Sequence, residues 1–193
     1  MFKPTLRREF LRFGAVAATA LVWDDDLDAA ECGETEDNIE GPYYKAGAPE
    51  RSSLWEPGME GTKLTVSGRV LNTRCEPIPY AVIDAWQCSA KGEYDNKTYY
   101  LRGKLKADGK GKYEMTTILP PPYKVGADRY RPAHIHLKLS GKGTKLLTTQ
   151  LYFEGDKWNG RDSAYRKPLT LNPTDAKNGA KKASFDFHLR TEA

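Results

Sequence analysis

Short segments in which apolar and polar residues alternate constrain the fold of this chain most. Within residues 64–71, Leu64, Val66 and Val70 alternate with polar side chains. Successive side chains of a strand point to opposite faces, so such a segment buries one face and leaves the other polar. The sequence predicts further strands at 80–87, 113–118, 133–139, 146–153 and 184–189.

Glycine- and proline-rich connections separate these segments, and no stretch shows helical periodicity over three turns. Residues 154–182 are polar and are expected to be rich in loops. Several short strands with turn residues between them predict an all-β fold, an antiparallel β-sandwich with long irregular loops.

Length and composition limit the class of protein. A chain of 193 residues suits one well-packed domain. No uncharged apolar run approaches the ~20 residues of a spanning helix, so no membrane span is expected. The net charge of +4 is mild. Nucleic-acid binding is not expected either, because a dense basic stripe is missing.

The N-terminus predicts export. Arg7 and Arg8 lie in a segment that resembles the twin-arginine motif, and the apolar stretch 13–22 follows it. We therefore expect a twin-arginine-type signal segment at 1–30, a single domain at 31–193, and a periplasmic or extracellular location. The alternative is a basic, amphipathic start to a small helix. The cleavage site is left open.

The three cysteines, Cys32, Cys75 and Cys88, form no CxxC pair. A zinc site built on thiolates is therefore not expected. In an exported protein, one disulfide and one remaining thiol are expected. The sequence does not choose the pair.

A histidine pair is the sharpest local feature. His134 and His136 are one residue apart on a predicted strand, so both point away from the core and can bind one metal ion. The opposite row is apolar: Ala133, Ile135, Leu137 and Leu139. The pair alone fits either a metal site or a polar outer face, which Lys138 would extend. His188, between apolar neighbours, is expected to face outward and not to bind metal.

A metal at the histidine pair would need oxygen ligands from Asp, Glu or Tyr. Two of the 11 tyrosines, Tyr94 and Tyr123, lie at predicted turns, and three prolines stiffen the approach to Tyr123. Phenolate is a hard donor that suits a ferric ion. Its free pKa of ~10 means that the metal must displace the proton at neutral pH.

Several motifs occur in an order known from one family: GRVLNTRCEPIPYAVIDAWQ (68–87), GEY (92–94), TILPPPY (117–123), RPAHIHLKLSG (131–141) and LTTQLYFEGD (147–156). With these motifs the chain resembles the intradiol ring-cleavage dioxygenases, which include catechol and protocatechuate dioxygenases. The resemblance covers residues 40–156. It implies a β-sandwich that cleaves catechol-type rings with O2 and yields muconate-type dicarboxylates.

The resemblance also implies the cofactor and the site. An iron(III) ion would be held by Tyr94, Tyr123, His134 and His136. Tyr123 and His134 match the axial ligand positions, and Tyr94 and His136 match the equatorial ones. Tyr123, Arg131 and Gln150 match residues that act on the substrate. No organic cofactor is expected.

The segment between Tyr94 and Tyr123 is shorter than the family pattern, which leaves Tyr99 or Tyr100 as an alternative ligand. Catechol, protocatechuate and hydroxyquinol remain candidate substrates. A carboxylated ring would call for a cation such as Lys124 or Arg129. Homo-oligomerisation is also left open.

Two other classes of protein compete with the enzyme. One is a secreted binding module on the same fold, and the other is a copper-binding domain that uses the histidine pair alone. Metal content, colour and oxygen uptake separate them from the enzyme.

Overall fold

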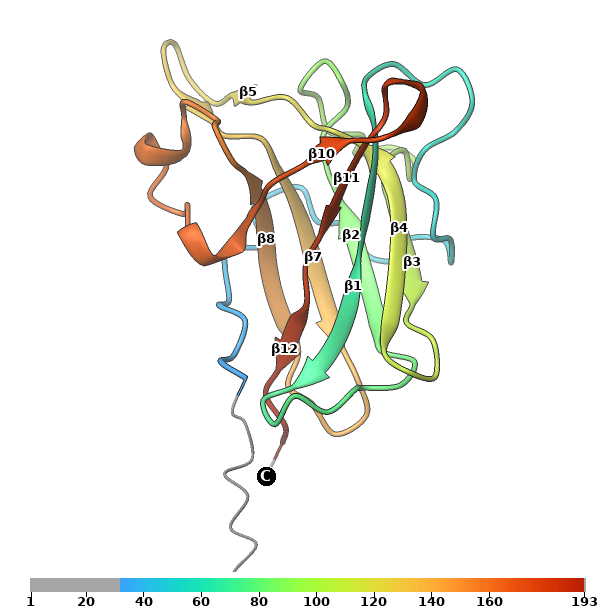
Figure 1. Cartoon of the computed structure of the whole chain (residues 1–193). Coiled ribbons are helices and arrows are strands. Elements are labelled where there is room, and N and C mark those ends of the chain that lie inside the picture. The colour runs from blue at the N-terminus through green and yellow to red at the C-terminus, as the bar shows by residue number, and fades with distance from the viewer. Residues whose placement is uncertain (1–31, 193) are drawn as a thin grey trace, which may run out of the picture.

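Two five-stranded sheets pack face to face in the computed structural model, which describes residues 32–192 (Figure 1). The first sheet has the order β10-β11-β1-β12, and β4 pairs with β1. Its strands are β1 (Lys63–Asn72), β4 (Lys112–Ile118), β10 (Thr174–Asp175), β11 (Lys181–Ser184) and β12 (Phe187–Leu189).

The second sheet has the order β3-β2-β7-β8-β9 and carries the candidate site. Its strands are β2 (Val82–Trp86), β3 (Arg102–Lys106), β7 (His134–Ser140), β8 (Leu147–Phe153) and β9 (Thr170–Leu171). Strands β5 (Tyr123–Lys124) and β6 (Tyr130–Arg131) pair in an antiparallel, two-stranded ribbon. The short 3-10 turns are η1 (Asn159–Arg161), η2 (Lys167–Leu169) and η3 (Lys177–Gly179).

The core lies where the inward rows of the two sheets meet. From β7, Ile135 and Leu137 face Leu64 and Val66 of the other sheet's β1 within one buried cluster. Burial of a large aliphatic side chain stabilises a fold by about 1.5–3 kcal/mol. The alternating pattern therefore fixes which face of β7 points inward, and it sends the two histidines to the opposite face.

The predicted all-β sandwich is confirmed, and the predicted strands match β1, β2, β4, β7, β8 and β12. Two details differ. The pairs β1–β11, β1–β12 and β8–β9 are parallel, so the sheets are mixed, because the chain after β8 returns to the sheets over long loops. Strand β3 was not predicted, because three of its five residues are cations.

Residues 38–51, which we call the strap, cross the outer face of the second sheet. The Asn38 amide donates to the Thr148 carbonyl of β8 at 2.7 Å, and the Arg51 amide donates to the Lys104 carbonyl of β3 at 2.7 Å. Midway, Tyr44 donates to the carboxylate of Asp84 at 3.1 Å. Figure 1 shows this segment, in blue to cyan, passing behind β8 and β7. The strap thus turns the outer face into a second buried layer.

A disulfide joins Cys32 to Cys75, with a Cα–Cα distance of 5.3 Å, whereas Cys88 is a buried free thiol. This pairing settles what the sequence left open. The expected signal segment, residues 1–30, lies outside the described residues.

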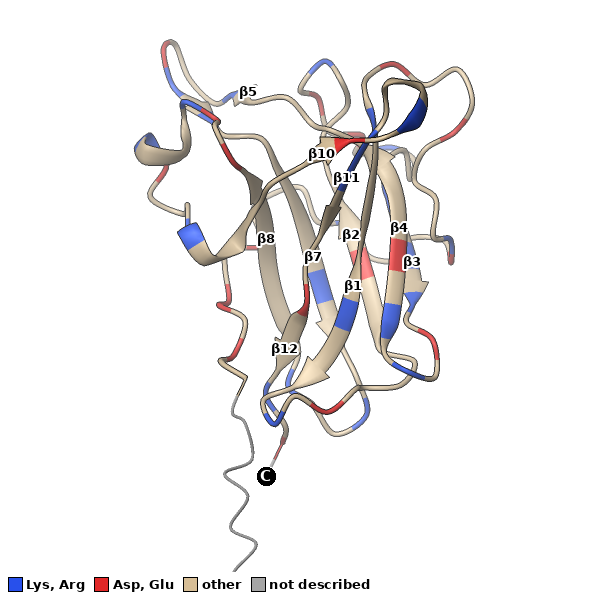
Figure 2. Ribbon diagram, in the orientation of Figure 1, with Lys and Arg blue, Asp and Glu red and all other residues tan. Residues whose placement is uncertain are grey.

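Charged residues of both signs occur throughout the described part of the chain. Figure 2 shows acidic and basic residues interspersed over the strands and loops of residues 32–192, without a single basic stripe. Within that same range, no helix is long and apolar enough to cross a membrane.

Candidate metal centre and active site

His134 and His136 point together from β7 into the layer beneath the strap. Each is 1% exposed, and their Nε2 atoms are 3.1 Å apart. Trp86, opposite His136 on β2, stacks on the His136 ring with centroids 4.9 Å apart. On the strap, Gly41 has φ of +73°, and a Cβ there would lie 3.2 Å from Cε1 of His136. Glycine therefore lets the strap pass close over the ring.

The tautomer of His134 follows from its hydrogen bond. Its Nδ1 lies 2.7 Å from the Pro132 carbonyl oxygen, which can only accept, so Nδ1 carries the proton. Burial, and then the charge of Arg131, lower the pKa of His134 to about 3. The ring is therefore neutral at pH 7, and Nε2 presents its lone pair to the centre of the cluster.

Tyr94 and Tyr123 bring two phenols to the same point. The Tyr94 hydroxyl is 3.4 Å from Nε2 of His134, and the Tyr123 and His134 ring centroids are 5.5 Å apart. The two phenol rings meet edge to face at 5.4 Å. A third ring, that of Tyr43 on the strap, stacks on Tyr94 at 4.3 Å.

The loops that carry the phenols are packed against each other. Gly92 has φ of +76°, and a Cβ there would lie 3.1 Å from Cβ of Tyr123. The glycine of GEY thus lets this loop lie against the end of the proline run. Burial raises the pKa of Tyr94 well above its usual value and also raises that of Tyr123. Both phenols are therefore neutral unless a cation displaces the proton.

The alternative tyrosines lie elsewhere. Tyr99 donates to the Ala46 carbonyl at 3.0 Å, and Tyr100 is partly exposed on the surface. Of the three tyrosines that the sequence left open, Tyr94 is the one that contacts His134. His188 lies on β12 of the other sheet, away from the cluster.

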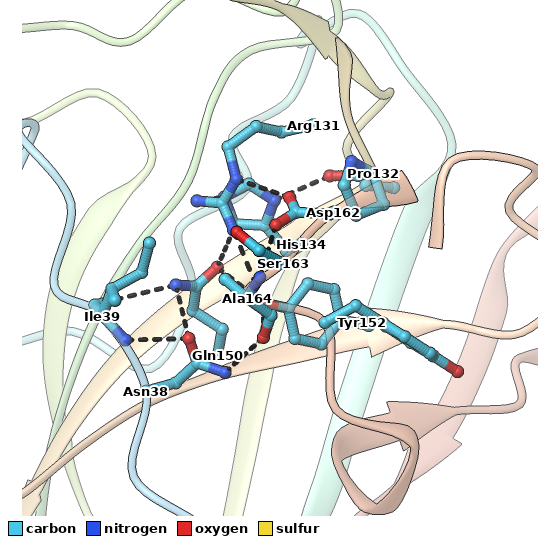
Figure 3. Close-up of polar contacts among 12 residues, drawn as sticks. Asn38, Ile39, Arg131, Pro132, His134, Gln150, Tyr152, Asp162, Ser163 and Ala164 are labelled. Atoms are coloured by element: carbon cyan, nitrogen blue, oxygen red, sulfur yellow. Dashed lines mark hydrogen bonds and ion pairs between the residues drawn. The ribbon is translucent and has the colours of Figure 1, made fainter. Parts of the chain in front are cut away.

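Arg131 and Gln150 adjoin the cluster in one polar network (Figure 3). Register places Arg131 opposite Tyr123 in the ribbon and Gln150 opposite His136 in the sheet. Nη2 of Arg131 donates to Oε1 of Gln150 at 2.9 Å, and its Nη1 lies 3.3 Å from Nε2 of His134. Both predicted residues are thus brought to the histidine pair.

Three residues of this network were missed from the sequence. Asp162 accepts from Nε of Arg131 at 2.8 Å in a largely buried ion pair. Tyr152 and Asn38 both donate to the Ala164 carbonyl, at 2.9 and 2.8 Å. Strand alternation puts Tyr152 on the face of Gln150, which was an available signal. Asp162 lies in the polar loop region, where no local pattern marks it.

The donor set can be tested for its fit to a metal. Among residues 32–192 there is no group of three His, Cys, Asp or Glu side chains that could hold an ion. The cluster instead offers two imidazoles and two phenols. Nδ1 of His136 is buried without a hydrogen-bond partner in this part of the chain. The lone pair on Nε2 of His134 lies only 3.1 Å from Nε2 of His136. A cation bound between these two nitrogens would fit this arrangement.

Comparison with known proteins defines the class. A family model described as "Dioxygenase" matches residues 39–191. Chlorocatechol 1,2-dioxygenase of Pseudomonas putida is 33% identical over 175 residues, which cover 80% of this chain and 67% of the relative. Catechol 1,2-dioxygenase of Pseudomonas sp. strain EST1001 is 34% identical over 72% of this chain, but the match spans only 54% of that relative.

Solved structures agree. The dioxygenase domain of a dioxygenase carbohydrate-binding protein fusion from Streptomyces sp. SirexAA-E superposes with a TM-score of 0.77 at 35% identity, covering 82% of this chain and 99% of that chain. The 3-chlorocatechol 1,2-dioxygenase of Rhodococcus opacus 1CP gives 0.77 at 31% identity, covering 81% and 72%. The chain belongs to the intradiol ring-cleavage dioxygenase family, a family of oxidoreductases.

Proposed function

We propose that this protein binds iron(III) and uses O2 to cleave catechol-type rings between the two oxygenated carbons, giving muconate-type dicarboxylates. The observation that carries the proposal is the convergence of four donors from separate elements, Tyr94, Tyr123, His134 and His136. Two phenolates and two neutral imidazoles make a hard donor set that suits a ferric ion. A binding module would not need this set, and a copper site on the histidines alone would leave both buried phenols unexplained.

The side chains around the donors have separate roles. Bound iron would act as a Lewis acid and template for the substrate. Tyr123 Oη would accept a proton from a catechol hydroxyl, and the adjacent Arg131 charge opposes the effect of burial on its pKa. Arg131 would stabilise negative charge that develops on the ring, and Asp162 fixes its direction. Gln150 holds the Arg131 fork, and the strap holds Gln150 through the Ile39 carbonyl at 2.7 Å.

The purified, iron-loaded protein is expected to be burgundy and to consume one O2 per catechol. The colour arises from tyrosinate-to-iron charge transfer. Iron content, the visible spectrum and an oxygen electrode check this, with zinc-reloaded protein as the control that lacks the band. A colourless protein with full iron content would contradict the phenolate ligands, and copper without such a band would favour the histidine-only site.

We infer that catechol is preferred and that substituted rings are tolerated. A carboxylated ring needs a nearby cation. Lys124 and Arg129, the candidates for that role, are both exposed. The same oxygen-electrode assay with catechol, protocatechuate and hydroxyquinol ranks the three. A kcat/KM for protocatechuate above that for catechol would reverse this inference.

We further propose that the protein is exported. The Arg7-Arg8 motif predicts it, and the Cys32–Cys75 disulfide supports it, because disulfides persist in oxidising compartments. Cell fractionation of the full chain is expected to find folded protein outside the cytoplasm. If Arg7→Lys and Arg8→Lys together leave its distribution unchanged, the twin-arginine interpretation is wrong.

A further inference from the structure

Arg102 is a buried cation on β3, and β2 separates it from β7, the strand of the histidine pair. It begins β3, pairs in register with Trp86 of β2, and is 1% exposed. Trp86 in turn stacks on His136. A guanidinium is rarely buried this completely, because removing a charge from water is costly unless partners compensate. The partners of Arg102 therefore indicate what its burial achieves.

Those partners belong to the two residues that follow Tyr94. Nε of Arg102 donates to the Asp95 carbonyl at 2.9 Å, and Nη2 donates to Oδ1 of Asn96 at 3.3 Å. The third group, Nη1, is buried without a hydrogen-bond partner among residues 32–192. Two hydrogen bonds from one rigid guanidinium group fix the turn that follows Tyr94.

The nearby carboxylate does not neutralise Arg102 through a direct hydrogen bond. The Asp95 side chain instead accepts from the amides of Lys97, Thr98 and Tyr100, each at 2.9 Å, and from the Thr98 hydroxyl. Burial lowers the pKa of Arg102, whereas the charge of Asp95 raises it. The buried guanidinium therefore makes its two hydrogen bonds to the turn after Tyr94 and none to the Asp95 carboxylate among the described residues.

We propose that Arg102 is the positioning residue for Tyr94: its buried guanidinium fixes the turn after this phenol and so sets where the ring lies beside the two histidines. This rests on the proposed function. The two phenols are thus held differently. Tyr94 stacks on the Tyr43 ring and precedes the turn that Arg102 fixes, whereas Tyr123 lies on a two-residue strand.

Arg51 provides the matched control. Its Nε donates to the Arg102 carbonyl at 3.0 Å, and its Nη2 donates to the Tyr99 carbonyl at 2.5 Å. It therefore braces the far end of the same loop with the same kind of side chain. Unlike Arg102, it is partly exposed and pairs with Glu56, and its hydrogen bonds within residues 32–192 do not include Asp95 or Asn96.

The test compares Arg102→Gln with Arg51→Gln in two measurements. In metal-free protein, amide exchange at Lys97 and Thr98 is expected to accelerate about tenfold or more in Arg102→Gln, the effect of losing a hydrogen bond from a charged donor. In iron-loaded protein, its charge-transfer band is expected to weaken, because a Tyr94 ring that is no longer held by its fixed turn contacts the metal less well. Arg51→Gln should change neither.

Arg102→Lys keeps the charge but loses the planar guanidinium, and it serves if Arg102→Gln does not fold. It is expected to show the weaker band and the faster exchange as well, because the two hydrogen bonds to the turn after Tyr94 are lost. An unchanged band and unchanged exchange in Arg102→Gln, or equal changes in Arg51→Gln, would overturn the assignment. If the parent protein itself shows no band, the proposed iron site fails, and the exchange measurement alone then decides the positioning role.

Discussion

Replacing Tyr123 with phenylalanine is expected to reduce catechol turnover by about 10²- to 10⁴-fold while the protein keeps its iron, the range typical of losing a general base. Phenylalanine fills the same space beside His134 and Gly92, so only the hydroxyl is lost. Three donors remain for the metal, but the phenolate that lies opposite Arg131 in the β5–β6 ribbon is lost and cannot take the substrate proton. The loss should therefore appear in kcat more than in KM.

Oxygen-electrode kinetics, iron analysis and the visible spectrum measure this together. Tyr99→Phe is the matched control, because it removes a phenol from the neighbouring loop that binds the Ala46 carbonyl and lies outside the cluster. That control is expected to keep parental turnover. Parental turnover in Tyr123→Phe would show that another group takes the proton, and loss of iron would show that this phenol is needed to hold the metal.

Removing the disulfide is expected to lower the free energy of unfolding by about 2–4 kcal/mol. The bond closes a loop between residues 43 apart in sequence, for which chain entropy alone predicts about 4 kcal/mol. Cys32 also lies six residues before the strap, so its release loosens the approach to the segment that covers His136.

Urea unfolding of a double Cys32→Ser and Cys75→Ser variant measures the effect. The control is reductant: the parent protein should lose the same free energy when reduced, while the variant should not respond. Equal unfolding midpoints for parent and variant under oxidising conditions would mean that the crosslink adds nothing to stability.

The sequence predicted most of the sandwich, because its strands bury one row and alternate cleanly. It missed β3, in which Gly103 and Leu105 alternate with three cations. Arg102 is buried, Lys104 is half-buried beside Asp84, and Lys106 is exposed and pairs with Glu50 of the strap. The partners of these cations lie on other segments of the chain. Local periodicity therefore had no access to them.

In the candidate site too, some residues follow from local sequence patterns and others depend on tertiary contacts. His134 and His136 followed from strand alternation, and the family motif pointed to Tyr123 and Tyr94. That Tyr94 lies beside His134 while Tyr99 binds the Ala46 carbonyl follows from the three-dimensional path of the loop. Asp162 was invisible because its importance arises only from its contact with Arg131, which lies on another element.

The strap has a consequence for the order of assembly. Its bonds join residues far apart in sequence: Ile39 to Gln150 across 111 positions and Asn38 to Ala164 across 126. Contacts of such long range form late, because loop closure must precede them. The ring donors therefore gain their buried surroundings only when both ends of the domain have come together. A metal ion at this site would therefore reach its fully buried surroundings only late in folding.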